Sequence, residues 1–86
     1  MNSKSYINHL IQGAEDCYNN FNEDNDVPFP CITILKSDVK KYNIEELKLI
    51  AKQEGYVFTD MLYAPKPLNA FPESYRQERY LLYKEI

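Results

Sequence analysis

The chain offers few side chains whose type and spacing could support catalysis or metal binding. It has one histidine, His9, and two cysteines, Cys17 and Cys31, which lie 14 positions apart without a CxxC spacing. Structural zinc sites normally use three or four ligands arranged in close pairs, which these residues do not provide. We therefore expect neither a metal nor a cofactor, and we expect both cysteines to remain free thiols.

Acid–base and nucleophilic chemistry are not indicated either. The sequence lacks a glycine-rich phosphate loop, a nucleophile elbow and an HExxH motif. The neighbouring carboxylates Glu15 and Asp16, like Glu45 and Glu46, diverge by about 100° if they lie on helices, so neither pair forms a shared acid–base site. We expect that the protein is not an enzyme.

Length and composition indicate a single globular domain over residues 1–86. Of the residues, 44% are hydrophobic, including eight tyrosines and four phenylalanines, which is enough for a real core. No apolar run approaches the ~18 residues of a membrane span, and the first residues lack the uninterrupted apolar stretch of a signal peptide. We therefore expect a cytoplasmic protein that does not bind membranes.

The negative charge is concentrated near the N-terminus. The chain has a net charge of -3, and residues 1–26 hold five carboxylates against one lysine. Proteins that bind duplex DNA usually carry a basic surplus, because neutralising phosphates dominates their affinity. The acidic region is a candidate surface for a basic partner, with an ordinary solvated face as the alternative. Its members are Glu15, Asp16, Glu23, Asp24 and Asp26.

Two segments have the periodicity of amphipathic helices. Apolar residues recur every three or four positions over residues 4–22 and again over 44–54. Asn43 and Glu46 form a capping-box pattern at the start of the second segment, and Gly55 follows its end, where a left-handed residue is favoured. The spacing therefore predicts two helices with these bounds.

Three short runs of β-branched and aromatic residues predict strands. They lie at residues 31–36, 56–63 and 78–86. Asn, Asp and Pro residues at 22–30 indicate a loop between the first helix and the first strand, and residues 64–75 hold three of the five prolines and form a long connection.

The order helix, strand, helix, strand, strand predicts an α+β fold with a small, three-stranded, mainly antiparallel sheet packed by two helices. Two architectures suit this order. In the first, both helices cover one face of the sheet and leave the other open. In the second, residues 38–41 form a separate short helix, residues 43–54 form a recognition helix, and the last two strands form a wing, as in winged-helix proteins.

Protein recognition is the function that the sequence favours. We expect the proline-rich connection to expose Leu68 and Phe71 near Tyr75, because long loops on compact scaffolds often bind partners and tyrosine is enriched at interface hot spots. Together with the acidic region, these residues form the predicted partner-binding surface of a small acidic accessory or inhibitor protein. The chain is rich in Asn, Lys, Tyr and Ile, which indicates an AT-rich genome, and we expect a phage or other mobile element as the source. A homodimer is compatible with these features.

Nucleic-acid binding is the second hypothesis. The predicted helix 44–54 would present Glu45 and Glu46 where a recognition helix meets bases and phosphates, which argues against duplex reading. Tyrosines on the last strand could stack the bases of a single strand if they are exposed, with core packing as the alternative. A winged-helix or sheet-surface binder would use Lys40, Lys41, Lys66, Arg76, Arg79, Tyr80 and Tyr83.

Overall fold

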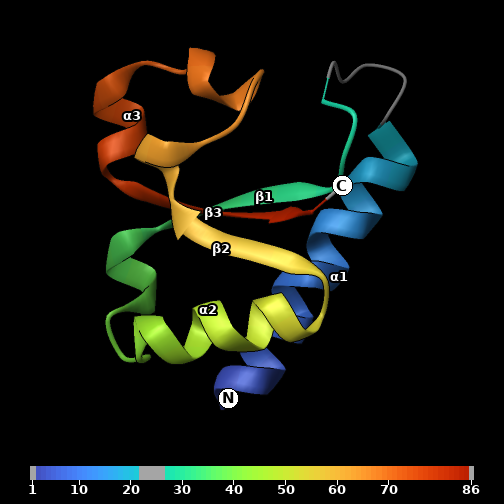
Figure 1. The fold of residues 1–86 in the computed structure, drawn as a ribbon, viewed down its shortest axis with the longest axis vertical. Helices are drawn as coiled ribbons and strands as arrows, with labels where there is room; N and C mark the ends of the chain where they lie inside the picture. The colour runs from blue at the N-terminus through green and yellow to red at the C-terminus, as the bar shows by residue number, and fades with distance from the viewer. Residues whose placement is uncertain (1, 22–26, 86) are drawn as a thin grey trace.

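The computed structural model describes residues 2–21 and 27–85, and these form a three-stranded sheet with helices (Figure 1). The predicted α+β class is confirmed. The helices are α1 (Ser3–Phe21), α2 (Ile44–Gln53) and α3 (Glu73–Gln77), and the strands are β1 (Cys31–Leu35), β2 (Tyr56–Asp60) and β3 (Arg79–Lys84). Short 3-10 turns, η2 (Lys36–Val39), η3 (Met61–Tyr63) and η4 (Leu68–Ala70), lie in the connections.

The last strand of the chain lies in the middle of the sheet. The strand order is β1-β3-β2, and β3 is antiparallel to both neighbours. Leu81 at the centre of β3 is paired with Thr33 on one side and with Thr59 on the other. Because β3 separates them, β1 and β2 are both edge strands and run in the same direction.

The two long helices pack on one face of the sheet and form the larger core. Gly13 lies where α1 crosses β1, and a Cβ atom there would be 3.6 Å from the Cδ1 atom of Ile32. The helices contribute Ile7, Leu10, Leu47 and Ala51 to this core, and the sheet contributes Ile34, Tyr56, Phe58 and Leu82. Apolar burial of this kind is the main term that holds a small domain together.

Local signals fix the ends of α2 as predicted. The Asn43 side chain accepts a hydrogen bond of 3.2 Å from the backbone N–H of Glu46. Gly55 follows the helix with a φ of 79°, a conformation that costs a glycine little and other residues more. Glu45 and Glu46 lie in the first turn, where carboxylates stabilise the helix dipole.

The second strand is shorter than the range of residues 56–63 that the sequence predicts. β2 ends at Asp60, and residues 61–63 form the turn η3, because the Asp60 carboxylate accepts a hydrogen bond of 3.0 Å from the Leu62 N–H. The chain is then directed over the face of the sheet opposite α1 and α2 (Figure 1). We call residues 61–78, which link β2 to β3, the β2–β3 segment.

This segment covers the second face of the sheet, which the first architecture leaves open. The second core consists of Phe29, Met61, Ala64, Leu68 and Leu81. The segment also contains α3, where the sequence suggested only an irregular connection. In the winged-helix alternative this region would project as a wing, whereas here it packs back on the sheet, and the turn before α2 is a 3-10 turn at Lys36–Val39 instead of a helix over 38–41.

Candidate functional site

Large apolar side chains are exposed on the β2–β3 segment. Tyr63 is 78% exposed, Phe71 is 42% exposed and Leu62 is 37% exposed. We call these three residues the apolar patch. Large apolar side chains that are exposed on one segment are candidates for a binding surface.

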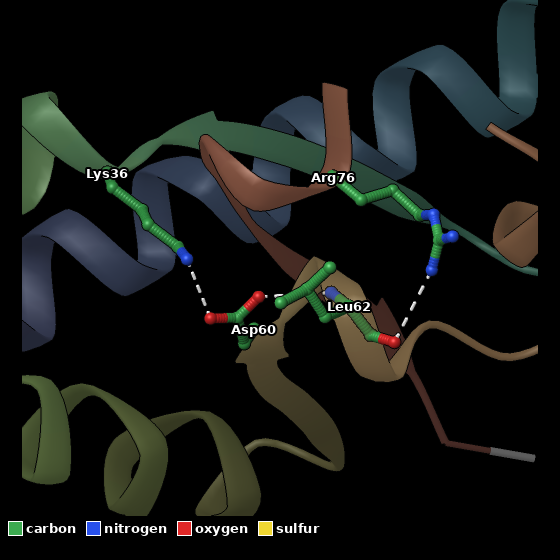
Figure 2. A network of polar contacts seen from close by, with 4 residues as sticks. All are labelled: Lys36, Asp60, Leu62 and Arg76. Atoms are coloured by element: carbon green, nitrogen blue, oxygen red, sulfur yellow. Dashed lines mark hydrogen bonds and ion pairs between the residues drawn. The ribbon is translucent and has the colours of Figure 1, made fainter. Parts of the chain in front are cut away.

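One guanidinium group brings two members of the apolar patch together. The Arg76 Nε–H donates a hydrogen bond of 2.9 Å to the carbonyl oxygen of Phe71. Its Nη1 donates to the carbonyl oxygen of Leu62 at 3.5 Å, as Figure 2 shows. Leu62 and Phe71 are therefore neighbours in space although η4 and two prolines separate them along the chain.

Asp60 anchors the start of the same segment to the sheet (Figure 2). One carboxylate oxygen accepts the Leu62 N–H, and the other lies 2.7 Å from the Lys36 Nζ at the end of β1. The Lys36 ammonium group also lies 5.4 Å from the centre of the Tyr80 ring. Asp60 thus connects the backbone of Leu62 both to β2, in which Asp60 lies, and to the end of β1.

Tyr75 supports the exposed ring of Phe71 from within the segment. The two rings are stacked with centroids 5.0 Å apart and an interplanar angle of 19°. The Arg79 guanidinium lies 3.6 Å from the centre of the Tyr75 ring and donates to its carbonyl oxygen, and the Tyr75 hydroxyl is 3.4 Å from the Thr33 Oγ1. Phe71 is consequently held on a stack that is attached to the sheet.

An apolar hollow adjoins Phe71. It has a volume of about 240 Å³ and is lined by Pro67, Ala70, Phe71 and Pro72. It is open to solvent and small compared with typical ligand pockets of roughly 300 to 1,000 Å³. The hollow is suited to receive one side chain from a partner surface.

The predicted partner-binding residues lie in different parts of the structure. Phe71 is exposed as expected, but the expected exposure of Leu68 is wrong, because its side chain is 5% exposed and fills the second core beside Leu81. Tyr75 is half-buried. Sequence reasoning missed Leu62 and Tyr63, because it assigned them to a strand.

The acidic region is only partly described. Glu15 is half-buried on α1, and Asp16 is exposed and accepts a hydrogen bond of 2.9 Å from the Gln12 side chain. The other three members, Glu23, Asp24 and Asp26, lie outside the described residues. The region therefore remains a prediction.

The residues proposed for nucleic-acid binding do not form one surface. Tyr80 packs against Phe58 on the α1–α2 side of the sheet, with ring centroids 5.3 Å apart. Tyr83 packs on the opposite side against Phe29, at 5.6 Å. Of the basic residues, Lys40, Lys41 and Lys66 are exposed, and Arg76 and Arg79 donate to backbone carbonyls.

Cys17 and Cys31 are free thiols. Burial, followed by the charge of Cys17, raises the pKa of the Cys31 thiol, which favours its neutral form. Within residues 2–21 and 27–85, no three His, Cys, Asp or Glu side chains gather as a metal site would require. In the same ranges, no helix combines the length and the apolar character needed to span a membrane.

Comparisons with known proteins identify no relative. No protein-family model matches the chain, and neither a curated protein nor a solved structure is significantly similar to it.

Proposed function

We propose that the protein is a non-enzymatic binding protein that recognises another protein through the apolar patch. The observation that carries this proposal is the exposure of Leu62, Tyr63 and Phe71 on a segment whose backbone is held by Arg76 and Asp60. Leaving large apolar side chains in water forgoes about 25 cal/mol for each Å² that a partner could bury. A complementary protein surface would recover that free energy.

The rigidity of the segment favours recognition over a purely structural role. Exposed rings on a flexible loop would lose conformational entropy on binding, and that loss weakens the affinity. Here the Phe71 ring is stacked on Tyr75, and its carbonyl oxygen is bonded to Arg76 before any partner arrives. A patch ordered in advance binds with less entropic cost, as interface hot spots commonly do.

The chemistry of the apolar patch indicates what kind of partner surface would fit it. Tyr63 and Phe71 need an apolar depression, and the hollow beside Phe71 can accept one small apolar side chain in return. Lys66 is exposed on the same segment and would contact the polar rim of the interface. An accessory or inhibitory role in a mobile element is compatible with this mode of binding.

The experiment is a binding comparison among three alanine variants. Tyr63→Ala and Phe71→Ala should each weaken partner capture about tenfold or more, as truncation of a hot-spot side chain does. Leu49→Ala is the matched control, because Leu49 is 59% exposed but lies on α2. Equal capture by all three variants would show that the patch is not the interface.

A fluorescence anisotropy assay separates this proposal from nucleic-acid binding. We expect no binding of duplex DNA, single-stranded DNA or RNA at micromolar protein in about 50 mM salt, where the electrostatic contribution is large. Micromolar binding that weakens steeply with added salt would overturn the proposal in favour of the second hypothesis.

A further inference from the structure

Within residues 2–21 and 27–85, no strand pairs with the outer edge of β1. The Lys36 N–H donates to the Glu78 carbonyl oxygen at 2.9 Å, and the Lys84 N–H donates to the Pro30 carbonyl oxygen at 3.0 Å. Bonding to the neighbouring strand alternates along an antiparallel ladder, so every second residue turns its N–H and C=O away from β3. In β1 these outward residues are Cys31, Thr33 and Leu35.

A groove runs along the C-terminal half of this edge. Its volume is about 610 Å³, and β1 contributes residues 33–35 to its lining. Tyr6 and His9 of α1 form one wall, and Tyr42 closes one end, where its ring stacks on Tyr6 at 4.4 Å and 12°. A groove between a strand with a free edge and a helix has the form in which an extended peptide adds to a sheet.

The edge of β2 is different. The Glu85 N–H donates to the Gly55 carbonyl oxygen, so the outward positions of β2 include Phe58. Lys48 and Lys52 line the hollow beside that edge. The five residues of β2 include the charged Asp60, which opposes pairing with another strand, whereas the five residues of β1 include neither a charge nor a proline.

The charges around the β1 groove indicate which peptide would fit. Lys41, Arg79 and the carboxylate Asp38 line it, and the Arg79 Nη1 also lies 4.0 Å from the Glu78 carboxylate. Lys41, which forms no ion pair with a described residue, is therefore the cation available to a ligand. A carboxylate on the ligand would therefore be attracted to the end of the groove near Lys41. A second copy of the chain would instead bring another net charge of -3 and its own α1 to the same edge.

We propose that the groove between β1 and α1 binds an extended peptide that carries an acidic residue. The peptide pairs with the outward backbone groups of Thr33 and Leu35 and places its carboxylate beside Lys41. This site is separate from the apolar patch, so the chain has two surfaces for protein recognition. Backbone pairing supplies affinity, and the acidic residue supplies direction and selectivity.

The test selects peptides from a random twelve-residue library displayed on phage, with the full chain as the target. Peptides that also bind the Thr33→Pro variant are discarded. This variant lacks the Thr33 N–H, which points away from β3, so the native ladder between β1 and β3 stays intact. We expect enriched peptides to alternate β-branched residues and to include Asp or Glu. Absence of enrichment over the Thr33→Pro background would overturn the proposal.

The best peptide is then synthesised in two forms, one unmodified and one with N-methyl groups at alternate residues. N-methylation removes backbone donors without altering side chains, and the loss of one or two hydrogen bonds should weaken binding about tenfold. This comparison does not depend on whether the Thr33→Pro variant folds. Equal affinity of the two forms would show that backbone pairing is not involved.

Amide NMR shifts locate the peptide. We expect shifts and slowed hydrogen exchange at Thr33 and Leu35, and a weaker affinity for the Lys41→Glu variant. Tyr63→Ala should bind the peptide normally, because Tyr63 is exposed and does not line the groove, so failure at the apolar patch can be distinguished from failure here. Shifts at Phe58 instead, or a Thr33 amide that is already protected in a peptide-free dimer, would contradict the proposal.

Discussion

The Arg76 guanidinium lies 2.9 Å from the carbonyl oxygen of Phe71, so the short helix α3 holds the backbone that carries an exposed ring five positions earlier. The same group reaches the Leu62 carbonyl oxygen at 3.5 Å. A single side chain therefore connects the two ends of the apolar patch.

Replacing Arg76 should weaken partner binding more than it lowers the free energy of unfolding. Arg76→Ala removes two hydrogen bonds to partly solvated carbonyls, and the free energy of unfolding should fall by only about 1 kcal/mol. Partner binding should weaken more, because Leu62 and Phe71 lose the link that orders them in advance. To check this prediction, partner affinity and amide hydrogen exchange in the β2–β3 segment are both measured for the variant and for the unchanged protein. Unchanged exchange would show that Arg76 does not order the segment.

Leu68 and Phe71 lie three positions apart, but replacing them with alanine should change stability by very different amounts. Leu68→Ala opens a cavity in the second core and should lower the free energy of unfolding by about 2 to 4 kcal/mol. Phe71→Ala removes an exposed ring and should change it by less than about 1 kcal/mol. Urea denaturation measures both. A small effect at Leu68 would mean that the β2–β3 segment is not packed on the sheet.

Gly13 offers a stabilising substitution. It lies inside α1, and a Cβ there would make only an ordinary contact of 3.6 Å with the Ile32 side chain. Because alanine favours helix more than glycine does, Gly13→Ala should raise the free energy of unfolding by up to about 1 kcal/mol. Gly55→Ala is the contrasting variant, since its φ of 79° is unfavourable for alanine. A loss of stability at Gly13 would indicate that α1 and β1 cannot accommodate the methyl group.

Tyr56 should make stability sensitive to high pH. Burial, with a further contribution from the nearby Glu15 carboxylate, raises the pKa of Tyr56 from 10.0 to about 12. Between these values the unfolded chain loses the proton and the folded chain keeps it, so stability is full below pH ~10 and falls as the pH rises towards 12. The loss should be on the order of 2 kcal/mol.

Urea denaturation at pH 9 and at pH 11.5 checks this expectation. Tyr56→Phe should show a smaller fall in the free energy of unfolding than the unchanged protein. Tyr63→Phe is the matched control, because it removes a hydroxyl from an exposed ring. If Tyr56→Phe and Tyr63→Phe behave alike, the Tyr56 hydroxyl does not have the assigned environment.

The parts of the fold that local chemistry decides could be predicted. Asn43, Glu46 and Gly55 determine the ends of α2 through their own backbone contacts, and the helix has the bounds that they indicate to within one residue. Strand β1 was similarly evident, because Pro30 precedes it and a turn follows it. These signals depend on neighbours in the sequence alone.

The β2–β3 segment could not be predicted in the same way. Residues 56–63 are mostly suited to a strand, but the chain turns after Asp60, where the Asp60 carboxylate caps η3 and Met61 is buried against Leu81, which lies 20 positions later. One signal was present: Leu81 and Leu82 are adjacent in β3 and must point to opposite faces. Two apolar faces imply cover on both sides, and the proline-rich connection was available to provide it.

Site-specific photo-crosslinking tests the central proposal most directly. A benzophenone amino acid is placed at Tyr63, and in a second variant at Leu49, which is exposed on α2. Irradiation in the cells that produce the protein should join position 63 to one discrete protein, and position 49 should give no such product. Crosslinking of the same protein from position 49 alone, or of nucleic acid from position 63, would contradict recognition of a protein through the apolar patch.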